Sequence, residues 1–138
     1  MDNQAFHITD YDMKRLKDFL QKAQYWPEED AKLLDRLRAK LDFAVVTSQK
    51  EAPPYLVTMN SHVKIVDLNS RKDKVFWLVY PEEACFGEDK VSIISELGIA
   101  VLGSKTGDTV QCVSNSVKKQ IRIARIYYQP ETYKHYNL

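Results

Sequence analysis

The chain has 138 residues, of which 44% are hydrophobic and 28% are charged. These values are typical of one soluble globular domain, or of a small domain with an appendage, and the chain is long enough to bury a core. With 20 basic and 19 acidic residues, the formal net charge is only +1. This balance argues against general binding to nucleic acid or to an anionic membrane.

No signal or membrane segment is predicted, because the N-terminus is neither basic nor apolar and no run of about eighteen apolar residues exists. The two cysteines, Cys85 and Cys112, lie far apart and outside any CxxC motif. The histidines His7, His62 and His135 have no carboxylate or cysteine partners at the spacing of metal ligands. We therefore expect a cytoplasmic protein with reduced thiols and without a metal or another cofactor.

Residues 1–47 are predicted to form an antiparallel helical hairpin. Thr9 followed by Asp12 resembles the capping box that begins a helix, and Pro27 suits the start of a second helix. Apolar residues recur every three or four positions in both segments: Met13, Leu16, Leu20 and Ala23, then Leu34, Leu37, Leu41 and Ala44. Two such stripes pack together as a short coiled coil. At about 1.5 Å per residue, a helix from Asp10 to Gln24 forms an arm of roughly 22 Å.

The predicted tip of the hairpin carries two aromatic and three acidic residues: Tyr25, Trp26, Glu28, Glu29 and Asp30. Carboxylates in the first turn of a helix are favoured by the helix dipole, so the acidic residues have a structural explanation. The aromatic residues allow two interpretations. Either they are exposed anchors for a partner, or Trp26 folds back over the helix ends or onto the other domain.

Residues 48–54 (SQKEAPP) are predicted to form a polar linker, and residues 55–138 are predicted to form an antiparallel sheet domain. Val63 and Ile65 alternate with polar neighbours, as in a strand with one solvent-facing side. Val75–Val79 contains no polar break and is interpreted as a central strand covered on both sides. A helical hairpin followed by a sheet domain belongs to the α+β fold class.

The last predicted strand, Lys118–Gln129, changes its buried face. Ile121 and Ile123 share one face, whereas Ile126 has the opposite parity, which predicts either a β-bulge or an exchange of the buried face near Ala124. The strand also contains four basic residues: Lys118, Lys119, Arg122 and Arg125. On a regular strand these residues are distributed over both faces. We therefore interpret them as a solvated edge and not as a nucleic-acid groove.

Five fragments occur in the order and spacing of one known family: VTMNSHV, LVYP, SIISELGIAVLG, GD and YQPE. Through them, residues 55–131 resemble the C-terminal domain of the Gre transcript-cleavage factors, which bind bacterial RNA polymerase. The short hairpin makes the chain most similar to the Rnk subgroup, the regulators of nucleoside diphosphate kinase. The resemblance implies an FKBP-like fold for this domain, with an antiparallel sheet wrapped on one short helix.

The resemblance also implies a partner and a docking site. In the family, the C-terminal domain docks on the rim of the polymerase secondary channel, while the coiled coil points inward. The family's Ser-Pro-Leu-type docking turn corresponds to Ser95, Glu96 and Leu97, with glutamate in place of proline. From the residues alone, Ser95 is also explained as the N-cap of a short helix, Glu96–Leu102.

Three functions follow as hypotheses. The first is a non-enzymatic regulator that binds RNA polymerase at this rim and competes with longer coiled-coil factors, because its arm ends before the active site. The second is a transcript-cleavage factor whose carboxylates, Glu28, Glu29 and Asp30, help to hold the polymerase's magnesium. The third, from the fold alone, is a prolyl isomerase or ligand-binding module. We expect the first, with no catalytic residue, no sequence-specific nucleic acid, no membrane and no small-molecule substrate.

Overall fold

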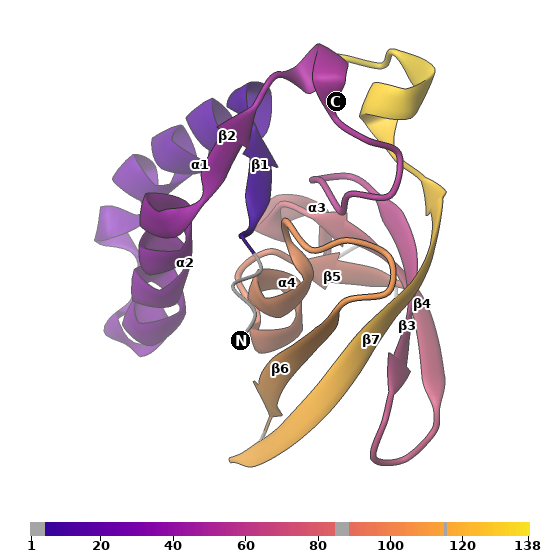
Figure 1. Cartoon of the computed structure of the whole chain (residues 1–138). Coiled ribbons are helices and arrows are strands. Elements are labelled where there is room, and N and C mark those ends of the chain that lie inside the picture. Colours follow the sequence, from indigo (N-terminus) through magenta and orange to yellow (C-terminus); the bar gives the residue numbers. More distant parts are fainter. Residues whose placement is uncertain (1–4, 85–88, 115) are drawn as a thin grey trace.

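The computed structural model describes residues 5–84, 89–114 and 116–138. Helices α1 (Asp10–Lys22) and α2 (Ala31–Phe43) form an N-terminal hairpin beside a five-stranded sheet (Figure 1). The expected α+β class is therefore confirmed. Within the described residues, no helix has the length and the apolar character needed to cross a bilayer. Cys112 is a free, buried thiol, whereas Cys85 lies outside the described residues.

The hairpin begins and turns at the positions that the sequence indicated. The Thr9 Oγ1 atom accepts a hydrogen bond from the Asp12 backbone N–H at 3.1 Å. This bond satisfies one of the backbone donors that the first turn of a helix leaves unpaired. Two 3₁₀ turns, Ala23–Tyr25 and Glu28–Asp30, lie on either side of Pro27 and connect α1 to α2.

A short parallel ladder, which the sequence did not suggest, closes the base of the hairpin. It consists of β1 (His7–Thr9) and β2 (Val45–Thr47). The His7 backbone N–H also donates to the Gly103 carbonyl at 3.2 Å. Gly103 has a φ of +81°, and a Cβ atom at this position would lie 3.2 Å from the His7 carbonyl oxygen. Glycine therefore permits both the left-handed backbone and the close approach of β1.

The segment predicted as a linker is partly ordered. A 3₁₀ turn, Gln49–Glu51, is capped by Ser48, whose side chain accepts from the Lys50 backbone N–H. The Gln49 backbone N–H donates to the Asp10 carboxylate at 3.0 Å, which joins this segment to the start of α1. The domain boundary at residues 48–54 stays a prediction.

The sheet has the strand order β5-β4-β3-β7-β6. Its strands are β3 (His62–Asp67), β4 (Asp73–Val79), β5 (Lys90–Ser92), β6 (Thr109–Ser114) and β7 (Val117–Tyr128). The pair β4–β5 is parallel, with the short helix α3 (Pro81–Ala84) between them in the chain, and the other neighbours are antiparallel. The sheet is therefore mixed and not wholly antiparallel. Helix α4 (Glu96–Val101) follows β5, and a 3₁₀ turn, Pro130–Tyr133, follows β7.

Strand β4 does not have the two covered faces that the sequence suggested. Phe76 and Leu78 are fully buried, but Val75 is 38% exposed and Trp77 is half-buried. The alternation arises because the hairpin and α4 lie on one side of the sheet (Figure 1). The prediction of a strand covered on both sides is therefore wrong. The middle position of the sheet belongs to β3.

Strand β7 contains the predicted bulge. Ile123 pairs with Ile65 and Arg125 pairs with Lys64, so Ala124 has no partner on β3. An extra residue of this kind reverses the alternation of the strand from that point onward. The prediction of a bulge near Ala124 is confirmed.

The same bulge changes the position of two basic residues. Arg122 lies opposite Val66, and Arg125 lies opposite Lys64. Val66 and Lys64 are two residues apart on β3 and point to the same face. Arg122 and Arg125 therefore share one exposed face of the sheet. The expectation that regular alternation separates them is wrong.

The hairpin and the sheet share one hydrophobic core. The cluster includes the seam of both helices, the inner face of the sheet and α4: Leu16, Leu20, Leu34, Leu37, Val63, Phe76, Ile123 and Ile99. Two buried polar side chains add hydrogen bonds at this junction. The Asp12 carboxylate accepts from the Met59 backbone N–H at 3.0 Å. The Lys40 ammonium donates to the carbonyls of Ile99 and Ala100. The base of the hairpin is thus attached to the sheet domain at two points.

Candidate functional site

The turn that begins α4 is held by its own hydrogen bonds. Ser95 is the N-cap, because its Oγ atom accepts from the Gly98 backbone N–H at 2.9 Å. The same Oγ atom donates to the Ser92 carbonyl at 2.7 Å. Gly98 is required here, since a Cβ atom would lie 2.2 Å from the Ser92 carbonyl oxygen. The predicted capping role of Ser95 is confirmed.

Glu96 and Leu97 follow Ser95 on the first turn of α4, and we refer to Ser95–Leu97 as the α4 turn. The Glu96 carboxylate forms an ion pair with Arg36 of α2. The Glu96 side chain remains 35% exposed and that of Arg36 remains 48% exposed. Leu97 is half-buried and packs partly against the core. The α4 turn is therefore a partly exposed corner of the sheet domain that is linked to the hairpin.

The two aromatic residues of the hairpin tip have different surroundings. Tyr25 is 85% exposed. Trp26 is half-buried and meets the Phe19 ring edge-on, with the ring centroids 5.2 Å apart. Trp26 also borders a cavity of about 400 Å³ that Tyr80 and Pro81 of the sheet domain line. Trp26 thus covers the end of α1, whereas Tyr25 is open to a partner.

The acidic residues of the tip occupy the 3₁₀ turn before α2. Glu28 and Glu29 are exposed, and Asp30 is half-buried. Their place at the amino end of α2 suits the helix dipole. Among the residues that the structure describes, no three His, Cys, Asp or Glu side chains are arranged to hold a metal ion. Helix α1 has 13 residues, so it separates the tip from the base by about 20 Å.

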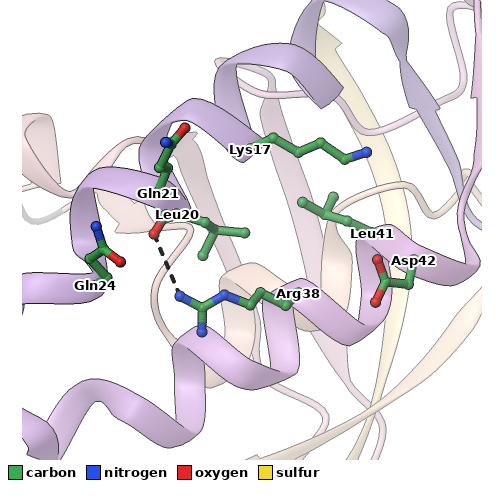
Figure 2. A pocket seen from close by; sticks show the side chains of 7 residues that line it. All are labelled: Lys17, Leu20, Gln21, Gln24, Arg38, Leu41 and Asp42. Atoms are coloured by element: carbon green, nitrogen blue, oxygen red, sulfur yellow. Dashed lines mark hydrogen bonds between the residues drawn. The ribbon is translucent and has the colours of Figure 1, made fainter.

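A groove lies between α1 and α2 on the hairpin surface (Figure 2). Its volume is about 380 Å³, and seven residues line it: Lys17, Leu20, Gln21, Gln24, Arg38, Leu41 and Asp42. The Arg38 side chain reaches from α2 toward α1, where its Nη2 atom donates to the Leu20 carbonyl at 3.5 Å. A cation near the carboxyl end of a helix is favoured by the dipole of that helix. Arg38 therefore helps to hold the two helices together.

The polar groups at the base of the hairpin have shifted protonation equilibria. Burial raises the pKa of Asp12 to about 7, and the charge of Glu131 adds to the increase. Burial lowers the pKa of Lys40 to about 7. Both groups therefore change charge near neutral pH at the points where the hairpin meets the sheet domain.

Comparison with known proteins relates this arrangement to one family. Residues 52–128 match the family model described as transcription elongation factor, GreA/GreB, C-terminal. The chain is 32% identical over 125 residues to the regulator of nucleoside diphosphate kinase of Escherichia coli (strain K12), and the match covers 90% of each chain. It is also 32% identical over 77 residues to the transcription elongation factor GreA of Thermodesulfovibrio yellowstonii, which covers 56% of this chain and 49% of that protein.

A solved structure shows the same architecture. The prokaryotic transcription elongation factor GreA/GreB from Nitrosomonas europaea superposes with a TM-score of 0.71 at 30% identity, covering 91% of this chain and 100% of that one. These similarities define a class of transcription factors with an N-terminal helical hairpin and a C-terminal sheet domain. The chain belongs to the GreA/GreB transcription elongation factor family. Both the family resemblance and the likeness to the Rnk subgroup are confirmed.

Sequence reasoning found the α4 turn and the hairpin tip but missed the residues that join α2 to α4. Arg36 pairs with Glu96, and Lys40 binds the carbonyls of Ile99 and Ala100. Arg36 and Lys40 are four residues apart, which places them on one face of α2. This four-residue spacing was the sequence feature that could have indicated a shared contact surface. The groups that Arg36 and Lys40 contact depend on how α2 packs against the sheet domain, and no local sequence pattern specifies that packing.

Proposed function

We propose that this protein is a regulator of transcription that binds bacterial RNA polymerase through the α4 turn, at the rim of the secondary channel. The observation that carries the proposal is the conformation and exposure of this turn in a domain of the GreA/GreB family. The Ser95 cap holds it in one conformation, yet Glu96 is 35% exposed and Leu97 is half-buried. A preformed, partly exposed turn binds without a further cost of ordering.

We further propose that the protein has no catalytic role of its own. Helix α1, with 13 residues, provides an arm of only about 20 Å. An arm of this length, attached to a domain docked at the rim, ends before the active site of the polymerase. Glu28 and Glu29 are exposed at its tip, but carboxylates assist a metal-dependent hydrolysis only when they reach the metal. The protein would then occupy the docking site and exclude longer factors.

Retention on immobilised core RNA polymerase tests the binding surface. Leu97→Glu places a charge in the proposed contact, so we expect retention to fall about tenfold or more. Ser95→Arg adds a bulky cation to the same turn and is expected to have a similar effect. Leu68→Glu is the matched control, because Leu68 is a 37% exposed leucine in the β3–β4 connection. It should bind like the wild type.

Thermal melting must accompany these measurements. Ser95→Arg removes an N-cap, which costs about 1 kcal/mol, so a small decrease in its Tm is expected without loss of the folded state. Equal retention of the wild type, Leu97→Glu and Ser95→Arg would eliminate the α4 turn as the contact. An equal loss for Leu68→Glu would show that the effect is a general consequence of added charge.

Stalled elongation complexes separate the regulator from a transcript-cleavage factor. We expect no shortening of the transcript above the rate of the polymerase alone. We also expect an excess of this protein to slow cleavage by a longer Gre factor, because both would occupy one site. Transcript shortening that disappears in a Glu28→Gln, Glu29→Gln variant would instead show that the tip reaches the catalytic metal.

A further inference from the structure

The face of the sheet opposite α4 carries an ordered array of aromatic and basic side chains. Pairing across β4, β3 and β7 produces three rows: Trp77 with His62 and Tyr128, Val75 with Lys64 and Arg125, and Asp73 with Val66 and Arg122. Successive rows are about 7 Å apart. We name this surface the aromatic-basic face and define it by seven residues: His62, Lys64, Trp77, Arg122, Arg125, Tyr127 and Tyr128.

The aromatic members form a continuous platform. His62 stacks on Trp77 with the ring centroids 4.3 Å apart and the planes inclined by 4°. Tyr128 continues the row at 5.6 Å from Trp77. Tyr127 lies 5.5 Å from His62 and is 42% exposed. Tyr128 is itself stacked on Tyr133, with the ring centroids 5.3 Å apart. His62 and Tyr128 therefore each have a ring face covered by a neighbouring ring. An unpaired base would stack on the exposed Tyr127 and on the half-buried Trp77.

The basic members lie beside these rings. Arg122 and Arg125 are exposed, and the Arg125 guanidinium lies 5.3 Å from the Tyr127 ring centroid. The Lys64 ammonium lies 3.4 Å from the Asp73 carboxylate. The three rows, all of whose residues the structure describes, contain one acidic side chain, that of Asp73. Three cations against one carboxylate leave a local positive charge that the net charge of the whole chain does not reveal.

The charges at the other end of the platform offset each other. Glu83 and Lys90 line a cavity of about 190 Å³ together with Trp77. The positive charge is therefore concentrated on the β7 side, next to Tyr127 and Tyr128. This arrangement suits a chain that places its bases on the rings and its phosphates along β7.

We propose that the aromatic-basic face binds single-stranded nucleic acid without sequence preference. The bases stack on Tyr127 and Trp77, and the phosphates pair with Lys64, Arg122 and Arg125. A duplex offers phosphates but keeps its bases stacked inside, so it cannot use the rings. An acidic peptide would use the cations alone. The proposal goes beyond polymerase binding and is independent of it, because α4 packs on the inner face of the sheet.

Fluorescence anisotropy with a labelled oligouridylate of about 12 nucleotides tests the proposal on the full-length protein. We expect saturable binding in about 50 mM KCl. If three phosphates are neutralised, affinity should fall on the order of 20-fold between about 50 and 200 mM KCl. A blunt duplex of the same length, and polyglutamate as a competitor, should bind at least about tenfold more weakly, because neither can stack on the platform.

Two pairs of variants separate stacking from charge. Tyr127→Leu should weaken binding about tenfold without changing the salt dependence. Its matched control is Tyr55→Leu, because Tyr55 is a 51% exposed tyrosine outside the sheet. Arg125→Glu should lower the slope of log affinity against log salt by about 0.7. Its control is Lys14→Glu, an exposed basic residue of α1, which should bind almost like the wild type.

Several results would overturn the proposal. Absence of saturable binding in about 50 mM KCl would show that the array is structural. Equal affinity for the duplex or for polyglutamate would show a general anion surface, and so would equal losses for Lys14→Glu and Arg125→Glu. A Leu97→Glu variant should bind the oligonucleotide like the wild type, so failure of polymerase binding and failure of this proposal are distinguishable.

Discussion

The base and the tip of the helical hairpin are built in opposite ways. At the base, Asp12 and Lys40 are buried and hydrogen-bond across to the sheet domain. At the tip, Tyr25 is 85% exposed and Glu28 is exposed. Groups that hold the fold together are therefore concentrated where the hairpin meets the domain. At the far end, Tyr25 and Glu28 contribute little to the fold and are exposed to a partner.

This difference matters for two surfaces: the α4 turn, which we propose as the polymerase contact, and the hairpin tip, for which one predicted role is to anchor a partner. The ion pair between Arg36 and Glu96 links α2 directly to the α4 turn, and Lys40 reinforces the same junction one helical turn away. These contacts hold α2 against the start and the end of α4, and so they help to set the position of the hairpin relative to Ser95–Leu97. A change that loosens the base should disturb the position of the tip before it disturbs the α4 turn.

The largest expected effect concerns the protonation of Asp12. Its pKa is about 7 in the folded protein against an ordinary value of 3.8, so the unfolded chain loses this proton first. The contribution to stability is full below about pH 4 and is lost as the pH rises toward 7. At about 1.4 kcal/mol per unit, the decline is on the order of 4 kcal/mol. Asp12→Asn should abolish it in urea unfolding at a series of pH values, because an amide keeps an acceptor for Met59.

Lys40 provides an internal control for this measurement. Its pKa is lowered from 10.5 to about 7, so the unfolded chain holds the proton longer as the pH rises. Stability therefore increases between about pH 7 and 10.5 on account of Lys40. Asp12→Asn should keep this second increase. Parallel curves for the wild type and Asp12→Asn between pH 4 and 7 would contradict a buried Asp12 with a pKa raised by burial.

The next effect concerns the packing of the hairpin. Leu37→Ala removes a fully buried side chain from α2 and should cost about 3 kcal/mol. For a chain of this size the Tm should fall by about 10 °C. Because the hairpin and the sheet share one core, we expect a single calorimetric transition. Two separate transitions in the variant would show that the base of the hairpin is not part of a common folding unit.

The sequence was most informative where the signal is local. The Thr9 cap, the Ser95 cap and the bulge at Ala124 each follow from a few adjacent residues, and each is present in the structure. The stripes of leucine likewise predicted the two helices of the hairpin. The domain boundary and the partner-binding role of the α4 turn and the tip stay predictions.

Features that depend on distant contacts could not be predicted in this way. The Asp12 carboxylate was expected only to help begin a helix, but in the structure it accepts from Met59. Val75 lies in an apolar run, yet it is 38% exposed, because the hairpin and α4 pack on the other face of β4 (Figure 1). The face on which Arg125 lies is set by the bulge at Ala124, because the bulge reverses the alternation of β7 beyond it. For Asp12 and Val75, the packing of another element decides the outcome.

A smaller effect is expected at the link between the hairpin and the α4 turn. Arg36 and Glu96 are 48% and 35% exposed, so a double-mutant cycle should measure less than about 1 kcal/mol of coupling. Glu96→Arg should reduce polymerase retention. Adding Arg36→Glu should restore an ion pair between positions 36 and 96. It should not restore retention on the polymerase, because position 96 still presents a positive charge to the partner. Recovery of retention in the double variant would mean that Glu96 only positions the turn through Arg36.

The smallest effect on stability is expected at the tip. Tyr25→Ala should change the free energy of unfolding by no more than about 0.5 kcal/mol, because the side chain is 85% exposed. Trp26→Ala should cost more, since the edge-on contact with Phe19 is worth about 0.5–1.5 kcal/mol beyond the buried area. A photo-crosslinking residue in place of Tyr25 should attach to a polymerase subunit in the wild-type background and not with Leu97→Glu. A crosslink that persists in Leu97→Glu would mean that the tip binds without the α4 turn, and the base would then have no role in presenting it.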